Sequence, residues 1–373
     1  MILCFAKITK KLSDICFICF NFTENYSLPL IKSFYRMYIL QTTSLTIGYK
    51  PHKIPVIVQS GLDLTVSGGE MVCLIGPNGC GKTTLLRTLC GLQAPIAGQS
   101  FVNGVDVQEI STRERALLIS LVLTDRIEVE HATVKTIVGL GRHPHSNWWG
   151  NISEEDDEKV NDAISLVHLE HKTDSLLTEL SDGERQRVMI AKAFVQDTPI
   201  IILDEPTAHL DLPNRVEIML LLHKLAHETG KTILISTHEL DMALQAADRI
   251  WLMTVEKGIE VGVPEDLVLN GNFSKAFKSD NFIFNPANGN FSMNYQLTNQ
   301  VEVSGDKTRM YWTLRALARA GYAAVDNADK KIVVEKDCWK MDDERFDSIE
   351  SLLSSLISHR ASSSQASCSR QSV

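Results

Sequence analysis

Residues 76–84 match the phosphate-binding pattern G-x-x-x-x-G-K-[ST] and read Gly76-Pro77-Asn78-Gly79-Cys80-Gly81-Lys82-Thr83-Thr84. The uninterrupted apolar run 71–75 precedes them and is typical of a buried strand, and residues 82–90 after them favour a helix. In this strand–loop–helix context, glycines let successive backbone N–H groups surround a phosphate, and the helix N-terminus adds positive potential. We therefore expect a nucleotide site rather than a glycine-rich turn without a ligand, with every residue from 76 to 84 as a candidate contact.

Two side chains of this loop carry specific chemistry. Lys82 would place a formal positive charge on the β- and γ-phosphates, and the Thr83 hydroxyl would be a ligand of Mg²⁺. The composition explains why a phosphate site in this chain needs its own positive charge. The chain has 373 residues and a formal net charge of −9, so its surface is a poor counterion for phosphates. The same charge argues against nucleic acid as a partner.

A second apolar run, residues 200–203, ends in two adjacent carboxylates, Asp204 and Glu205. Taken alone, this is equally well an acidic turn at the end of a strand. With a phosphate-binding loop on the same chain, we predict that Asp204 holds Mg²⁺ and that Glu205 is the general base that polarises the attacking water.

Residues 180–186 read Leu-Ser-Asp-Gly-Glu-Arg-Gln and precede a predicted helix. They resemble the LSGGQ signature of the ATP-binding-cassette (ABC) ATPases, with Asp182 in place of the first signature glycine and Glu184 in place of the glutamine. The resemblance implies that Ser181 and the Gly183 backbone N–H donate to a γ-phosphate and makes Glu184 a further candidate contact. By itself, the stretch is also compatible with an ordinary capped helix start.

Three more positions match this family. Tyr49 lies where the family stacks an aromatic ring on adenine, residues 208–211 resemble the D-loop and end in Asp211, and His238 matches the switch histidine that contacts the γ-phosphate. These elements follow the family order across residues 38–265, so the chain is identified as a member of the ABC ATPases.

The resemblance implies an α/β fold, that of the P-loop NTPases of the ABC-ATPase class, with a mostly parallel core sheet, an antiparallel β subdomain and a helical insertion. It implies ATP and Mg²⁺ as cofactors and ATP hydrolysis as the activity, with Glu205, His238 and Lys82 as catalytic residues. It also implies a head-to-tail homodimer, because each signature completes the phosphate site of the partner copy.

One position departs from the family. Where the family has a glutamine that senses Mg²⁺, this chain has Thr124, followed by Asp125. A hydroxyl or a carboxylate at this place would offer an oxygen ligand, so we keep Thr124 as a candidate metal ligand. Loss of one positioning contact lowers a rate by about two to three decades, so either turnover is low or a neighbour substitutes.

Residues 138–145, Val-Gly-Leu-Gly-Arg-His-Pro-His, resemble a stretch of the ATPases that energise uptake of iron–siderophore complexes, haem and cobalamin. The alternative is a helix C-cap followed by a proline. The resemblance implies integral membrane permease subunits as separate partners, one of which docks beside residues 124–145, and an extracytoplasmic substrate-binding protein that acts indirectly. It places the chain at the cytoplasmic face of the membrane as a peripheral protein.

Two other functions are compatible with the residues. One is a non-transport ABC ATPase that acts on nucleic acid or ribosomes, and the other is a nucleotide-binding regulator with low turnover.

The composition excludes some classes of protein. Hydrophobic residues make up 44% and charged residues 22% of the chain, which excludes a disordered chain and a polytopic membrane protein. No run of about 18 uninterrupted apolar residues predicts a membrane helix. The eight cysteines form no disulfide framework, and we expect Cys73, Cys80 and Cys90 to be reduced and packed.

The expected organisation has five parts. Residues 1–36 are expected to be a non-native or disordered extension before a start at Met37, and residues 37–268 form the ATPase domain with a helical subdomain at about 125–182. Residues 269–300 are expected to be a linker with a short helix at about 273–277, 301–358 a small α/β accessory domain in which Tyr311, Trp312 and Trp339 build the core, and 359–373 a disordered tail. We also predict a strand over 117–123 and helices over 134–140, 153–169 and 346–357.

Overall fold

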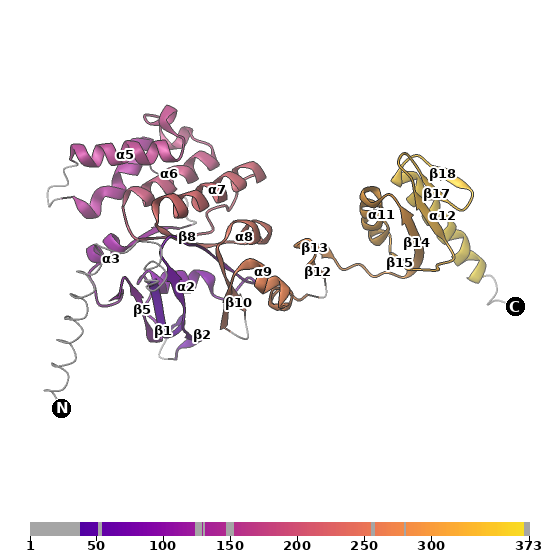
Figure 1. Ribbon diagram of the computed structural model, residues 1–373, viewed down its shortest axis with the longest axis horizontal. Coiled ribbons are helices and arrows are strands. Elements are labelled where there is room, and N and C mark those ends of the chain that lie inside the picture. Colours follow the sequence, from indigo (N-terminus) through magenta and orange to yellow (C-terminus); the bar gives the residue numbers. More distant parts are fainter. Residues whose placement is uncertain are drawn as a thin grey trace, which may run out of the picture. The chain divides into compact units, whose positions relative to one another are not determined.

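The computed structural model describes residues 38–50, 54–123, 129, 131–146, 153–254, 258–279 and 281–368, the last ten of them as backbone only. The expected extension 1–36, the Met37 start and Thr124 lie outside these residues. The chain divides into two units, Met1–Phe277 and Lys278–Val373 (Figure 1). In the described part, no helix is both long enough and apolar enough to cross a bilayer.

The first unit is built on a six-stranded sheet in the order β11-β10-β4-β9-β8-β7, which is parallel except for the antiparallel edge strand β11. Every residue of β4, β8 and β9 is buried. Strands covered on both faces read as continuous apolar runs, which is why the sequence revealed them. The bounds are β4 Met71–Ile75, β7 Ile119–Val122, β8 Ile200–Asp204, β9 Thr232–Ser236, β10 Arg249–Thr254 and β11 Gly258–Gly262.

A second, antiparallel sheet lies in the same unit, in the order β2-β1-β5-β6, with β3 paired to β1. The hairpin between β5 and β6 turns at Asn103 and Gly104, which both have positive φ, as such a two-residue turn requires. The strands are β1 Tyr38–Tyr49, β2 Val56–Leu62, β3 Thr65–Ser67, β5 Ala97–Val102 and β6 Val105–Asp106.

A helical segment follows β7 and is drawn in magenta in Figure 1. Over residues 131–146 and 153–182, the only β pairing is the isolated bridge between Thr133 and Leu176. The helices of the unit are α2 Lys82–Leu89, α3 Thr112–Leu118, α4 Val134–Gly139, η2 Leu140–His145, α5 Glu154–Leu166, η3 Glu170–Lys172, η4 Leu177–Glu179, α6 Asp182–Val195, α7 Leu212–Thr229, α8 Leu240–Ala246, α9 Pro264–Leu269 and α10 Asn272–Ala276. The predicted parallel sheet, antiparallel sheet and helical insertion are therefore confirmed.

Two element predictions in this unit need correction. The strand expected over 117–123 begins only at Ile119, because a capping box between Ser111 and Glu114 starts α3, which continues to Leu118. The helix expected to close at Gly141 instead continues as the 3₁₀ helix η2 to His145, and α5 ends at Leu166 rather than near residue 169.

The second unit contains a β-hairpin and a five-stranded sheet in the order β15-β14-β16-β17-β18. It has its own hydrophobic core, which includes Val301, Leu317, Trp339 and Leu352. Its elements are β12 Phe282–Asn285, β13 Asn290–Met293, β14 Asn299–Gly305, α11 Lys307–Arg319, β15 Tyr322–Ala324, β16 Lys331–Val334, β17 Trp339–Met341, β18 Glu344–Phe346 and α12 Ile349–Cys368.

Three expectations for the C-terminal part differ from the structure. The stretch 269–300 contains α10 and the β12–β13 hairpin rather than only a linker with one short helix. The helix expected from Phe346 starts at Ile349, since Phe346 ends β18, and its backbone continues to Cys368 into the expected disordered tail. Extending an existing helix is much easier than nucleating one, so a polar sequence rich in serine can continue α12.

The aromatic residues of this unit also differ in burial. Trp339 is buried in the core, as expected, but Tyr311 and Trp312 are 43% and 56% exposed and do not build it. The buried face of α11 is formed by Thr313, Ala316 and Leu317, and the aromatic pair falls outside that stripe.

Candidate nucleotide-binding and hydrolysis site

The loop 76–84 connects the end of β4 to the start of α2. Gly79 and Gly81 have φ of 79° and 108°, in the left-handed region that favours glycine. A Cβ on Gly81 would also lie 2.3 Å from Val58 Cγ1, so β2 leaves no room for a side chain there. The loop therefore needs glycine at residue 81 for both conformation and space.

Lys82 is 7% exposed, and its Nζ donates to the carbonyl oxygens of Gly76, at 2.9 Å, and Pro77, at 3.2 Å. Burial lowers the pKa of the Lys82 ammonium, and the nearby Cys80, Glu205 and Asp204 act in the opposite direction. The loop thus holds a cationic side chain inside its own curve, oriented by backbone carbonyls.

Tyr49 ends β1 beside the loop. Its ring is half-exposed, and its hydroxyl forms a hydrogen bond with the Thr84 hydroxyl in α2. The structure therefore brings this sequence-predicted aromatic residue to the edge of the phosphate-binding loop.

The strand order brings the other candidate site residues to one edge of the sheet. Strand β9 lies between β4 and β8, and its last residue, Ser236, is paired with Leu74 on one side and Asp204 on the other. The carboxyl ends of parallel strands lie at one edge of a sheet, where α/β proteins bind ligands. The loop after β4, the acids of β8 and His238 after β9 consequently share that edge.

Ser236 is a member of the site that the sequence reasoning missed. Its hydroxyl donates to Asp204 Oδ1, and the Glu205 N–H donates to both the hydroxyl, at 3.0 Å, and the carbonyl of Ser236, at 3.1 Å. Asp204 is 6% exposed, so this hydroxyl satisfies a buried carboxylate. The sequence signal that could have identified Ser236 is its hydroxyl at the end of a neighbouring buried strand.

Glu205 and His238 form a pair. His238 Nε2 lies 2.7 Å from Glu205 Oε1, and both side chains are part-exposed. Glu205 has φ of 51°, a left-handed conformation that is uncommon in a residue other than glycine. Such backbone geometry persists where the surroundings enforce it, and the two hydrogen bonds from Glu205 N–H to Ser236 do so here.

The donor atoms at this edge fit Mg²⁺. Thr83, exposed at the start of α2, offers a hydroxyl, and Asp204 offers a carboxylate, and oxygen donors of this kind are the ligands that Mg²⁺ prefers. Thr124, the third candidate, lies outside the described residues.

Ser181, Gly183, Glu184 and Asp211 form a separate cluster at the starts of α6 and α7. Ser181 caps α6, and its backbone N–H and hydroxyl donate to Glu184 Oε2 at 2.8 and 2.9 Å. The hydrogen bond from the Ser181 N–H lowers the pKa of the Glu184 carboxyl. Glu184, which stands where the family has glutamine, is therefore committed to a capping box with the signature serine.

Asp211 caps α7 and accepts a hydrogen bond from Asn214 Nδ2 at 2.6 Å. A Cβ on Gly183 would lie 2.5 Å from Asn214 Oδ1. The close approach of α6 to the start of α7 thus explains why glycine occupies this position.

The segment 138–145 anchors the helical segment. Arg142 is 5% exposed and donates to Asp156 Oδ1 at 2.7 Å and to the Val195 carbonyl at 2.9 Å. Burial opposes ionisation of Asp156, but hydrogen bonds from Arg142 and Ser153 outweigh it and lower the pKa of this carboxyl. His145 contacts the Gln196 carbonyl at 2.8 Å, and both His143 and His145 are exposed.

Two family profiles match the chain: ABC transporter over residues 59–208 and iron ABC transporter C-terminal domain over residues 298–357. An uncharacterized ABC transporter ATP-binding protein of Methanocaldococcus jannaschii is 33% identical over 255 residues, which is 68% of this chain and 87% of that protein. The ferric enterobactin transport ATP-binding protein of Escherichia coli is 34% identical over 61% of this chain and 83% of its own length.

The iron(3+)-hydroxamate import ATP-binding protein of Bacillus subtilis is 33% identical over 65% of this chain and 88% of its own length. Among solved structures, a dimeric ATP-binding cassette in a post-hydrolysis state, bound to ADP and phosphate, matches with a TM-score of 0.53. It is 27% identical and covers 60% of this chain and 98% of that one. With the loop 76–84, the two acids Asp204 and Glu205, and His238 at one sheet edge, the chain belongs to the ATP-binding proteins of the ABC transporters, a family of ATPases.

Proposed function

We propose that this ATPase hydrolyses Mg·ATP at the edge formed by the ends of β4, β8 and β9. The observation that carries the proposal is the 2.7 Å contact between Glu205 and His238 beside the phosphate-binding loop. Lys82 and the loop N–H groups bind the phosphates, and Tyr49 stacks on the adenine. Thr83 and Asp204 would hold Mg²⁺, with Thr124 as a further ligand, and the ion would supply positive charge that neutralises the phosphates.

In this proposal Glu205 orients and deprotonates the attacking water, and His238 contacts the γ-phosphate. The pair places a hydrogen-bond acceptor next to a donor that also fixes its orientation, which is the arrangement general-base catalysis needs. Ser236 keeps Asp204 and the Glu205 backbone in position from β9.

The working unit of the proposal is a head-to-tail dimer. Ser181 and Gly183 at the start of α6, with Asp211 at the start of α7, close over the nucleotide of a second copy. The dimeric cassette bound to ADP and phosphate supports this arrangement. ATP binding closes the dimer and hydrolysis reopens it, so the nucleotide acts as a two-state switch.

We further propose that the switch drives uptake of an iron chelate through separate permease subunits at the cytoplasmic face of the membrane, supplied by an extracytoplasmic substrate-binding protein. The names of the E. coli and B. subtilis relatives and the C-terminal profile over residues 298–357 support iron chelates over haem or cobalamin. The segment 138–145, anchored by the buried Arg142, is the proposed permease-docking region.

Glu205→Gln tests the catalytic part. We expect turnover to fall by about 10²–10⁴-fold, because the general base is lost, while ATP binding persists. We also expect Mg·ATP to convert this variant into a stable dimer, measured by light scattering after size-exclusion chromatography.

Glu239→Gln is the matched control, since Glu239 is close in sequence but pairs with Arg215 at 2.7 Å. It should keep its turnover. Unchanged hydrolysis in Glu205→Gln, or no ATP-dependent dimer, would refute the proposed site. Uptake of radioactive iron chelate and of cobalamin by cells with and without the chain separates the cargo classes.

A further inference from the structure

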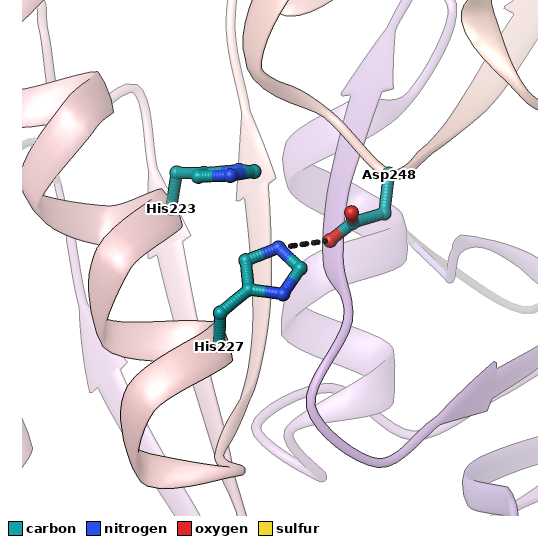
Figure 2. A group of neighbouring side chains, drawn as sticks. All are labelled: His223, His227 and Asp248. Carbon is teal, nitrogen blue, oxygen red and sulfur yellow. Dashed lines mark ion pairs between the residues drawn. The ribbon is translucent and has the colours of Figure 1, made fainter.

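Three side chains at the C-terminal part of α7 and the start of β10 form a cluster that the nucleotide site does not use. His223, His227 and Asp248 each offer a ligand atom, and these atoms all lie within 4.8 Å of one another (Figure 2). His223 and His227 are one helical turn apart, so both rings project from the same face of α7 toward Asp248. We propose that the three residues bind a divalent first-row transition metal ion, and this proposal does not depend on the proposed transport function.

A hydrogen bond orients the first ligand, His223. His223 Nδ1 lies 2.9 Å from the Ala246 carbonyl oxygen. A carbonyl only accepts hydrogen bonds, so Nδ1 carries the proton and the lone pair is left on Nε2. Metal-binding histidines are commonly oriented through their other ring nitrogen in this way. The hydrogen bond thus leaves Nε2 as the ligand atom of His223.

The second and third ligands are already at a suitable spacing. His227 Nε2 lies 3.2 Å from Asp248 Oδ2. Two ligands at the usual Zn–N and Zn–O lengths in tetrahedral geometry are separated by about 3.3 Å. The rings of His223 and His227 have centroids 4.3 Å apart, so a side-chain rotation brings His223 to the same ion.

Asp248 is itself held in place. Its Oδ2 accepts a hydrogen bond from the Met71 N–H at 2.7 Å, at the first residue of β4. Its side chain is 29% exposed and that of His227 is 45% exposed, so an ion can enter from solvent and keep water in the remaining positions. A bound metal would connect α7, β10 and β4 through one atom.

The donor set selects the class of ion. Two imidazoles and one carboxylate suit zinc and its neighbours such as cobalt, whereas Mg²⁺ prefers oxygen ligands alone. The last turn of a helix also carries negative potential, and His227 lies in that turn of α7. The cluster lies at the amino end of β4, whereas the phosphate-binding loop follows its carboxyl end.

The test uses the untagged full-length chain without nucleotide and Co²⁺ as a spectroscopic probe. We expect one equivalent of Co²⁺ to give visible bands of nitrogen and oxygen coordination, and Zn²⁺ to displace it and raise the melting temperature. Millimolar Mg²⁺ should leave the spectrum unchanged. Affinity should fall at least about tenfold in His223→Gln, His227→Gln and Asp248→Asn, since each removes a ligand.

His171→Gln, which changes an exposed histidine of η3, is the matched control and should bind Co²⁺ as the unaltered chain does. Asp248→Asn retains an acceptor for the Met71 N–H, and circular dichroism without metal verifies that each variant is folded. No Co²⁺ spectrum, a thiolate charge-transfer band, displacement by Mg²⁺, or unchanged binding in His223→Gln/His227→Gln would overturn the proposal. In those cases His227 and Asp248 form an ion pair only.

Discussion

At the scale of single residues, Ser236 determines how the acidic pair is presented. It is fully buried, its hydroxyl donates to Asp204, and it accepts from the Glu205 N–H. One side chain therefore fixes a proposed metal ligand and holds the backbone of the proposed general base at φ of 51°. A site built on two acids alone would leave both of these orientations unexplained.

Ser236→Ala is expected to lower ATP turnover by at least about tenfold and the free energy of unfolding by about 1–3 kcal/mol, because a buried carboxylate loses one of its hydrogen bonds. Steady-state ATP hydrolysis and urea denaturation measure the two effects. Ser120→Ala is the control, since Ser120 is also fully buried and pairs with Thr198 at 2.7 Å in the adjacent part of the sheet. Stability should fall in the control while turnover per folded molecule persists; equal turnover in both variants would contradict the role of Ser236.

At the scale of elements, the start of α6 is stabilised by the reciprocal capping of Ser181 and Glu184. The substitution of the family glutamine by Glu184 adds a negative charge in the first turn of the helix, where the helix dipole is favourable. The same exchange makes the signature helix sensitive to protonation, because the hydrogen bond from Ser181 lowers the pKa of the Glu184 carboxyl.

The pH dependence has a definite sign. A carboxyl whose pKa is lowered by folding stabilises the folded state above its ordinary pKa, about 4.3 for glutamate, and this contribution is lost as the pH falls through the lower folded value. Glu184→Ala should therefore be less stable than the unaltered chain at pH 7 by about 0.5–1 kcal/mol, with a difference that shrinks below pH ~4.3.

Urea denaturation at several pH values between neutral and acidic measures this difference. Glu184→Gln is the control, because an amide can still accept from the Ser181 N–H without titrating. A stability difference between the unaltered chain and Glu184→Ala that stays constant through the acidic range would contradict the argument.

At the scale of the whole molecule, the two units have separate hydrophobic cores. In the second unit, Trp339 is 7% exposed, donates from Nε1 to Thr313 Oγ1 at 2.8 Å, and has the Arg309 guanidinium 3.9 Å from its ring centroid. Trp312, on α11 of the same unit, is 56% exposed. Two tryptophans of one small unit therefore occupy opposite environments.

Trp339→Ala should lower the free energy of unfolding of the second unit by about 3–5 kcal/mol, because it leaves a cavity and removes the hydrogen bond to the Thr313 hydroxyl. Calorimetry is expected to show one transition shifted downward while ATP hydrolysis by the first unit persists. Trp312→Ala, the control, should change stability by no more than about 0.5 kcal/mol. Equal destabilisation by the two changes would contradict the assignment of the core.

The parallel core strands and the loop at residues 76–84 were predictable from the sequence. Strands buried on both faces show as unbroken apolar runs, and a phosphate-binding loop needs glycines at fixed spacing. Both features can therefore be recognised in a short stretch of sequence. The helix starts at Ser153 and Ser181 were also readable, because a capping box lies within four residues. By contrast, the β12–β13 hairpin and the exposure of Trp312 depend on packing partners that no local pattern reveals.

Only the tertiary structure decided which distant residues meet. The placement of β9 between β4 and β8 brings Ser236 to Asp204, across 32 residues of sequence, and Glu205 to His238. The packing of α7 beside the start of β10 likewise brings His223 and His227 to Asp248. Strand order and helix packing are set by burial of the whole core, which is a property of the folded chain. A sequence motif, by contrast, reflects only the requirements of its own short stretch of chain.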